Sequence, residues 1–170
     1  SQVFAHEACR GTEERTAKEV TFMSANVDTS FFGIHEDIIL TKEGVWLSNG
    51  EEITHPGTLI GFSRNIYRCK EGFEIRLGLE HKVFHAEDTI YFVTGLEGNT
   101  DTGFNLRLND GRQEKLDAGT LNYKPGRLTC KVLHPNDNTH EEAKFLTGAY
   151  YELLKHVEKT AKGFEVTIEG

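Results

Sequence analysis

One short motif occurs twice in the chain and limits the possible folds more than any other feature. Gly-Phe-Glu followed by alternating aliphatic residues is found at residues 72–79 and again at 163–168. Such alternation is typical of a strand with one buried face. Each copy follows a stretch with helical periodicity, and each of these stretches follows two β-rich runs that flank a glycine turn. The sequence therefore predicts an α+β fold with two repeated hairpin–helix–strand units and antiparallel strands between them.

The first unit begins with a hairpin, whose β-rich runs at 38–41 and 45–47 flank Lys42-Glu43-Gly44. A helix is expected next, capped by Thr54 and ended by Gly72, because apolar residues recur there every three or four positions. These residues are Leu59, Phe62, Ile66 and Cys69.

The middle of the chain is expected to be all β. After Gly72 the predicted strand has one apolar and one charged side, as a half-buried strand does. The apolar side consists of Phe73, Ile75, Leu77 and Leu79, and the charged side of Glu74 and Arg76. Two more strands are expected at 81–88 and 89–98. Two hairpins should follow, one turning at Asn109-Asp110-Gly111 and one at Pro125-Gly126.

The last helix is expected to run from Thr139 to Gly163. Thr139 and Glu142 have the spacing of a capping box, in which each side chain accepts a hydrogen bond from a free amide of the first turn. An apolar stripe follows, typical of a helix that packs on a core. It consists of Leu146, Tyr150, Leu153 and Val157, with Ala149 and Leu154 beside it.

Alignment of the two units supports an internal repeat. It pairs Glu51-Glu52 with Glu141-Glu142, and the two pairs lie at nearly equal distances before the two Gly-Phe-Glu motifs. Neither unit is expected to bury its apolar faces alone. The predicted organisation is an N-terminal extension over 1–36, a first repeat over 37–98 and a second repeat over 99–170, packed as one compact globular unit.

Composition and charge exclude several classes of protein. The 170 residues suit a single domain, and the formal net charge of −8 repels phosphate backbones and anionic lipids. We therefore expect neither nucleic acid nor a membrane as partner, and no apolar stretch is long enough to span a membrane. The three cysteines, Cys9, Cys69 and Cys130, lack metal-ligand or redox spacing. Free thiols of this kind favour a reducing compartment, so the sequence predicts a cytoplasmic protein. No cofactor is expected.

A scattered pattern of residues links the chain to a known family. The pattern consists of Glu43-Gly44-Val45-Trp46, Gly50, Leu59-Ile60-Gly61-Phe62, Glu80 and Ala86-Glu87-Asp88, with the late segment 141–157. In these residues the chain resembles the domain-of-unknown-function family 1285 of bacterial proteins. Thr89-Ile90 departs from that family, which usually has a small residue and a proline there. The resemblance implies a two-repeat α+β fold and a role in signalling or ligand binding, and it supplies no catalytic residues.

Two polar segments are candidate functional sites, and the first has metal-binding chemistry. His81, His85 and Glu87 project to one face if 81–88 is a strand, and two imidazoles with a carboxylate can bind a divalent metal. The two histidines are roughly 13 Å apart on a straight strand, so a shared ion needs a bend and a plain polar face is the alternative. The second segment contains His134, Asp137, His140 and Glu141. Helix capping also explains this segment.

The remaining candidates for ligand binding come from the repeat. Paired carboxylates at Glu51 and Glu52, and at Glu141 and Glu142, suit acid–base or ligand-binding work if the repeats face each other. Favourable charges at helix starts explain the same residues. Trp46 is either a core residue or a stacking platform for a ligand.

These observations predict a ligand-binding or regulatory module of the signalling type, whose partner is a small molecule or a protein bound between the halves. The competing hypothesis is a metal-dependent hydrolase that uses the His81, His85 and Glu87 face or the segment from His134 to Glu141. A third hypothesis is a structural protein that binds its partner through an exposed β edge.

Overall fold

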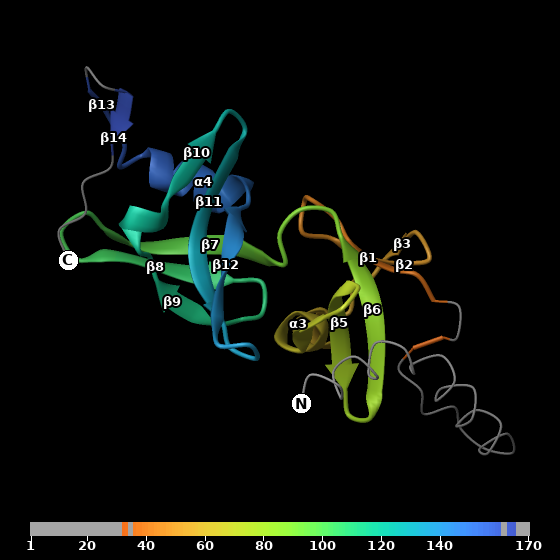
Figure 1. Cartoon of the computed structure of the whole chain (residues 1–170). Helices are drawn as coiled ribbons and strands as arrows, with labels where there is room; N and C mark the ends of the chain where they lie inside the picture. The colour runs from red at the N-terminus through yellow and green to blue at the C-terminus, as the bar shows by residue number, and fades with distance from the viewer. Residues whose placement is uncertain (1–31, 34–35, 161–162, 166–170) are drawn as a thin grey trace, which may run out of the picture. The chain divides into compact units, whose positions relative to one another are not determined.

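The computed structural model describes residues 32, 33, 36–160 and 163–165 of the chain. The chain divides into two compact units, Ser1–Asp88 and Thr89–Gly170. The fold is of the mixed α+β class, as predicted, and strands make up most of it (Figure 1). The division falls at Asp88, before β7, whereas the predicted boundary at residue 98 lies inside that strand.

The described residues of the first unit form a six-stranded sheet and one helix. Their order along the chain is β1 (Ile38–Leu40), β2 (Trp46–Ser48), β3 (Glu51–Glu52), α3 (Pro56–Arg64), β4 (Ile66–Cys69), β5 (Gly72–Leu77) and β6 (Glu80–Ala86). The strands lie in the sheet as β3-β2-β1-β6-β5-β4. The central pair β1 and β6 is parallel, and the other neighbours are antiparallel.

The hairpin at the start of this unit confirms the prediction from its turn residues. β1 pairs with β2 so that Leu40 lies opposite Trp46. Asn49 and Gly50 then have φ of 49° and 83°, the left-handed conformations that a tight turn between β2 and β3 needs. The Asn49 side chain also accepts a hydrogen bond from the Asp37 amide at 2.8 Å, which fixes the turn to the start of β1.

Aromatic side chains fill the core of the first unit. The Trp46 ring is 2% exposed and lies 5.5 Å from the Phe62 ring and 4.9 Å from the Phe84 ring, measured between centroids. Its indole N–H donates to Ser63 Oγ at 3.3 Å. Phe62 and Ser63 belong to α3, so Trp46 joins the helix to the sheet and is a core residue.

The predicted helix from Thr54 to Gly72 is wrong in its second half. Helix α3 begins after His55, whose Nδ1 accepts from the Thr58 amide at 3.2 Å, and ends at Arg64. Asn65 ends it, because its side-chain amide donates to the Gly61 carbonyl at 2.7 Å. The residues Ile66 to Cys69, read as helical from their spacing, form β4 and pair with β5.

The charged side of β5 is also not exposed as predicted. Glu74 is fully buried and accepts a hydrogen bond from Arg76 Nε at 2.6 Å. Arg76 in turn covers the Tyr67 ring, with 4.2 Å between the guanidinium carbon and the ring centroid. Leu79, expected on the apolar side, lies outside β5 in the turn before β6 and is 76% exposed.

The described residues of the second unit form another six-stranded sheet, with one helix and a short hairpin. Their order is β7 (Tyr91–Asn99), β8 (Gly103–Leu108), β9 (Gln113–Lys115), η1 (Ala118–Thr120), β10 (Asn122–Lys124), β11 (Arg127–His134), β12 (Thr139–Phe145), α4 (Thr147–Leu154), β13 (Glu158–Thr160) and β14 (Gly163–Glu165). The sheet order is β10-β11-β12-β7-β8-β9, with β7 and β12 parallel at its centre.

The strands predicted in the middle of the chain are confirmed. In β8 the side chains of Phe104, Leu106 and Leu108 are buried, and those between them are exposed. The hairpin of β8 and β9 turns through Gly111, and that of β10 and β11 turns through Gly126 after a proline, with φ of 83° and 76°.

The predicted helix from Thr139 to Gly163 is wrong at both ends. Thr139 and Glu142 form no capping box, because they lie in β12 opposite His134 and Lys131 of β11. The helix α4 spans only Thr147–Leu154, and its N-cap, Leu146, makes no side-chain capping bond. The Gly-Phe-Glu at Gly163 is the strand β14, which pairs with β13.

Candidate functional site

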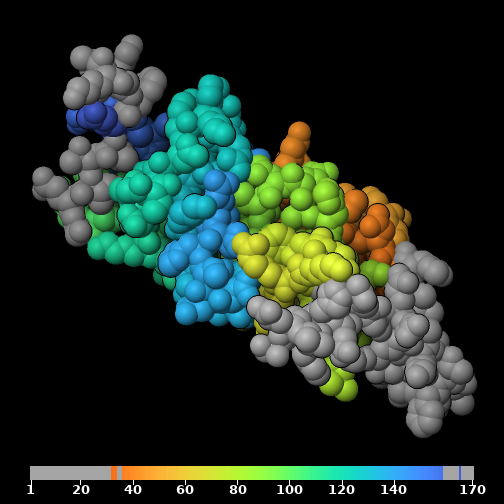
Figure 2. All heavy atoms as spheres, in the orientation of Figure 1, coloured from red at the N-terminus to blue at the C-terminus, as the bar shows by residue number. Residues whose placement is uncertain are grey.

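The second unit contains a pocket of about 450 Å³ beside helix α4. Four elements or their flanks supply its walls: η1, β10, β11 and α4. The residues that line it are Ala118, Leu121, Tyr123, Leu128, Tyr150, Leu153, Leu154 and Val157. The β10–β11 hairpin, one of these walls, lies at the surface of the unit (Figure 2).

The helix wall of the pocket is the apolar stripe that the sequence shows. Leu153 is buried against the sheet, and Tyr150 and Leu154 lie at helical spacing beside it. Val157 continues the stripe after the helix has ended. The spacing of the stripe predicts a helix that packs on a core, and periodicity alone does not reveal that the stripe faces a pocket.

The opposite wall is held by hydrogen bonds to η1. The Asp117 carboxylate caps η1 by accepting from the Gly119 amide at 3.0 Å. The Thr120 hydroxyl accepts from the Lys131 amide of β11, also at 3.0 Å. These bonds hold the backbone on both sides of Ala118 and at the residue before Leu121.

Two tyrosine hydroxyls are the main polar groups of the pocket. The hydroxyls of Tyr123 of β10 and Tyr150 of α4 lie close enough to affect each other's ionisation. Desolvation and then the neighbouring Tyr123 hydroxyl raise the pKa of Tyr150, so its hydroxyl stays protonated and neutral. The Tyr151 ring packs edge-on against Tyr150 at 5.4 Å between centroids. The pair therefore offers neutral donors and acceptors at an apolar wall.

None of the described residues that line the pocket has a charged side chain. Lys124 follows Tyr123 in β10, so its side chain projects from the opposite face of the strand. Lys155, after α4, pairs with Glu152 at 2.8 Å. Arg127 of β11 pairs with Glu142 of β12 at 2.9 Å.

A second polar cluster in this unit has a structural role. Arg112 donates to Asp110 at 2.7 Å and to the Leu133 carbonyl of β11 at 2.8 Å. The Glu114 carboxylate accepts from the Leu133 amide at 3.1 Å. The cluster thus joins the β8–β9 hairpin to β11. These strands are not neighbours in the sheet, so backbone pairing does not connect them. Burial raises the pKa of the adjacent Tyr91 although Arg112 opposes the shift, so Tyr91 stays neutral.

The two polar segments predicted from sequence are not brought together as metal sites. His81 and His85 lie in β6, where His81 is opposite Arg76 of β5 and His85 is exposed. The Glu87 carboxylate accepts from the Lys42 amide at 2.9 Å. Within the described ranges, no group of three or more His, Cys, Asp or Glu side chains is placed to hold a metal ion.

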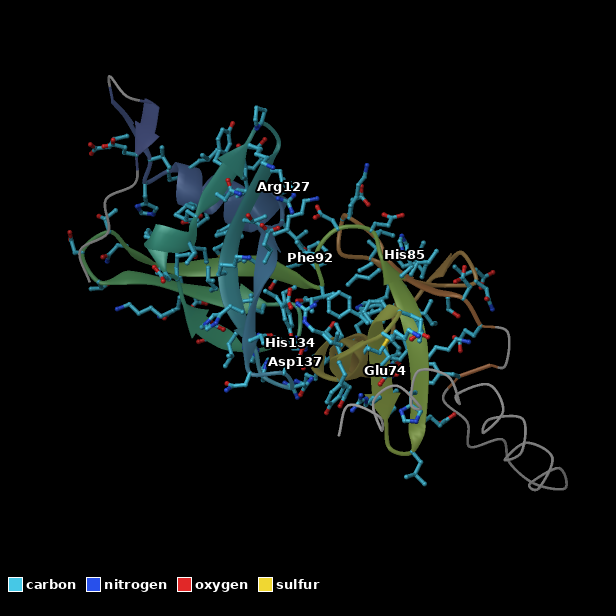
Figure 3. All side chains as sticks on the ribbon, in the orientation of Figure 1. Glu74, His85, Phe92, Arg127, His134 and Asp137 are labelled. Atoms are coloured by element: carbon cyan, nitrogen blue, oxygen red, sulfur yellow. The ribbon has the colours of Figure 1, made fainter. Side chains whose placement is uncertain are left out.

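The segment from His134 to Glu141 is divided between a strand end, a turn and β12. His134 and Asp137 lie at the β11–β12 turn, with 3.6 Å between Nδ1 and Oδ2 (Figure 3). His140 and Glu141 are in β12, opposite Leu133 and Val132. The segment therefore forms a hairpin and not the start of a helix.

The predicted ligand-binding residues are not among those that line the pocket. Glu51 and Glu52 are exposed in β3, at the edge of the first sheet. Glu141 and Glu142 lie in β12 of the second unit, and Trp46 is in the core of the first. None of the five lines the pocket.

The chain is similar to known proteins in its structure. No family model matches the chain, and no curated protein matches its sequence. The structure is similar to a DUF1285 family protein from Silicibacter pomeroyi DSS-3, with a TM-score of 0.54 and 16% identity over 79% of this chain and 76% of that one. The chain has the DUF1285 fold.

A second structure agrees with this result. A DUF1285 family protein from Shewanella baltica OS155 has a TM-score of 0.54 and 12% identity, over 71% of this chain and 92% of the other. The resemblance stated from the sequence is thereby confirmed for the DUF1285 fold, and identities this low carry no residue roles. Among the described helices, none is both long and apolar enough to cross a membrane.

Proposed function

We propose that this protein is a ligand-binding module and that the pocket beside α4 holds a small molecule. The volume of about 450 Å³ supports the proposal, because binding sites for small molecules commonly occupy about 300–1,000 Å³. Apolar walls with a few convergent polar groups are also typical of such sites, and here Tyr123 and Tyr150 supply the polar groups.

A regulatory role fits the limited burial of α4. The helix is short, lacks a side-chain cap and buries only Ala149 and Leu153. Short helices depend on packing for most of their stability. A ligand in the pocket would add contacts to Tyr150 and Leu154, so binding would stabilise α4. A partner protein that binds α4 would then respond to the ligand.

We also interpret the two units as an internal repeat, in a form that differs from the predicted one. Numbered from its own first strand, each sheet has the order 3-2-1-6-5-4 with a parallel central pair. This shared order supports descent from one unit of two three-stranded meanders. A cytoplasmic location fits the free thiols of Cys69 and Cys130.

The proposal is tested by blocking the pocket. Leu154 lines the pocket and is 38% exposed, so Leu154→Trp places a larger side chain at the pocket wall without disturbing the core. The matched control is Leu79→Trp, at an exposed turn of the first unit. The probe is phenylnaphthylamine, an uncharged dye whose fluorescence rises in apolar surroundings.

We expect the dye to bind the unchanged protein and the control equally, and the Leu154→Trp variant at least about tenfold more weakly. Hydrogen exchange should slow in α4 when the dye is bound, because the helix gains packing. Equal binding to all three proteins, or binding that leaves exchange in α4 unchanged, would count against the pocket.

A further inference from the structure

The chemistry of the pocket defines the class of molecule that fits it, if the pocket is the binding site as proposed. Six of the eight described lining residues are alanine, leucine or valine, which offer no hydrogen bond through their side chains. A ligand therefore gains most of its affinity from apolar surface. Each methylene group buried should strengthen binding about threefold to fourfold.

The hydroxyls of Tyr123 and Tyr150 provide one polar point on this wall. Each hydroxyl can donate one hydrogen bond and accept others, so a bond between the two would use only one donor. The second donor and the remaining lone pairs are available to a ligand. A single hydroxyl or carbonyl group on the ligand would satisfy them.

The surroundings of this polar point favour a neutral ligand group over a charged one. The groups that affect the pKa of the Tyr150 hydroxyl are two other tyrosines, Tyr123 and Tyr151. Among the described residues that line the pocket, none carries a charge that could neutralise a carboxylate, a phosphate or an ammonium group. Burying an unpaired charge against apolar walls is strongly unfavourable, whereas a neutral head loses little.

The volume limits the size of the ligand. About 450 Å³ corresponds to roughly fifteen groups of the size of a water molecule, at about 30 Å³ each. An alkyl chain of medium length or a two-ring aryl group, with one polar head, fits this limit. Longer lipids would leave part of their chain in water.

We propose that the ligand is an uncharged amphiphile of medium size, with an alkyl or aryl body against Leu128 and Leu153 and a hydroxyl or carbonyl head bound by Tyr123 and Tyr150. This rests on the proposed function, since it assigns a ligand class to the same pocket.

The test compares molecules that share one alkyl chain and differ in the charge of the head. Decanol is neutral, decanoate is an anion and decylammonium is a cation at neutral pH. Each competes with phenylnaphthylamine for the full chain, and octanol is included to measure the effect of two methylenes. We expect decanol to bind at least about tenfold more tightly than either charged molecule, and about tenfold more tightly than octanol.

Tyrosine variants test the head-binding pair. Tyr123→Phe and Tyr150→Phe each remove one hydroxyl and should weaken decanol roughly twofold to tenfold. Tyr151→Phe is the matched control, because Tyr151 is 60% exposed and does not line the pocket. It should leave decanol binding unchanged.

Failure of the ligand class is distinguishable from failure of the pocket. If decanoate or decylammonium binds as tightly as decanol while Leu154→Trp still weakens binding at least about tenfold, the pocket is a binding site and the neutral class is wrong. The neutral class is also wrong if all three tyrosine variants bind decanol as tightly as the unchanged protein does. If neither the dye nor any alkyl molecule responds to Leu154→Trp, the pocket and the ligand class are both overturned.

Discussion

At the scale of single residues, the two described cysteines have different surroundings. Cys130 is 1% exposed, and burial, with a smaller contribution from Glu114, raises its pKa from 9.0 to about 12. Cys69 in β4 is only half-buried. Alkylation needs an accessible thiolate, so Cys130 is protected both by its burial and by its raised pKa.

We expect iodoacetamide at mildly alkaline pH to modify Cys69 in the native protein and to leave Cys130 unmodified. Both should react once the protein is unfolded in concentrated guanidinium. Peptide mapping by mass spectrometry separates these cysteines from Cys9. Modification of Cys130 at the rate of Cys69 in the native protein would contradict the buried position of β11.

The same thiol makes stability depend on pH in a defined direction. The folded state holds the Cys130 proton more tightly than the unfolded chain, so the stabilising contribution is complete below pH 9.0 and is lost as the pH rises toward about 12. Within this window the loss is on the order of 1.4 kcal/mol per pH unit. Urea unfolding of the unchanged protein and of Cys130→Ala measures it, and the variant should show the shallower decline. Parallel declines would show that another group is responsible.

At the scale of elements, two glycines that the sequence alone does not distinguish are expected to respond oppositely to alanine. Gly61 is inside α3, where an added Cβ meets no atom within 4 Å, so Gly61→Ala should stabilise the protein by about 0.5–1 kcal/mol. Gly98 in β7 has φ of 119°, and a Cβ there would collide with the Gly103 carbonyl. Gly98→Ala should therefore cost more than about 1 kcal/mol. Thermal unfolding of both variants is the measurement, and a shift of the same sign in both would contradict these assignments.

Elements fixed by local chemistry were predicted from the sequence, and elements fixed by distant partners were not. The hairpins turn at glycines with positive φ, such as Gly44 and Gly126, and this requirement is visible in the sequence. The segment around Glu141 has good helix formers, yet it is a strand because β11 and β7 pair with it on its two sides. The pocket was missed for the same reason, since its walls come from segments far apart in the chain.

At the scale of the whole molecule, the two sheets share no strand, and each unit has its own buried side chains. Ile75 in β5 is fully buried in the first unit, and Leu106 in β8 is 1% exposed in the second. Replacing either by alanine removes packed methyl groups and leaves a cavity, which should cost about 2–5 kcal/mol. The two variants are thus matched in chemistry and differ in the unit they affect.

We expect the loss of protection to follow the division of the chain at Asp88. In hydrogen exchange, Ile75→Ala should accelerate exchange mainly in β1 to β6, and Leu106→Ala mainly in β7 to β12, because each cavity lies in the core of one sheet. Ile39→Ala serves as a control, since Ile39 is only half-buried in β1 and its truncation should cost less. Equal acceleration along the whole chain by both core variants would mean that the units unfold together, as the prediction of one compact globular unit requires. Separate responses would mean that a ligand bound beside α4 stabilises the second unit without holding the first.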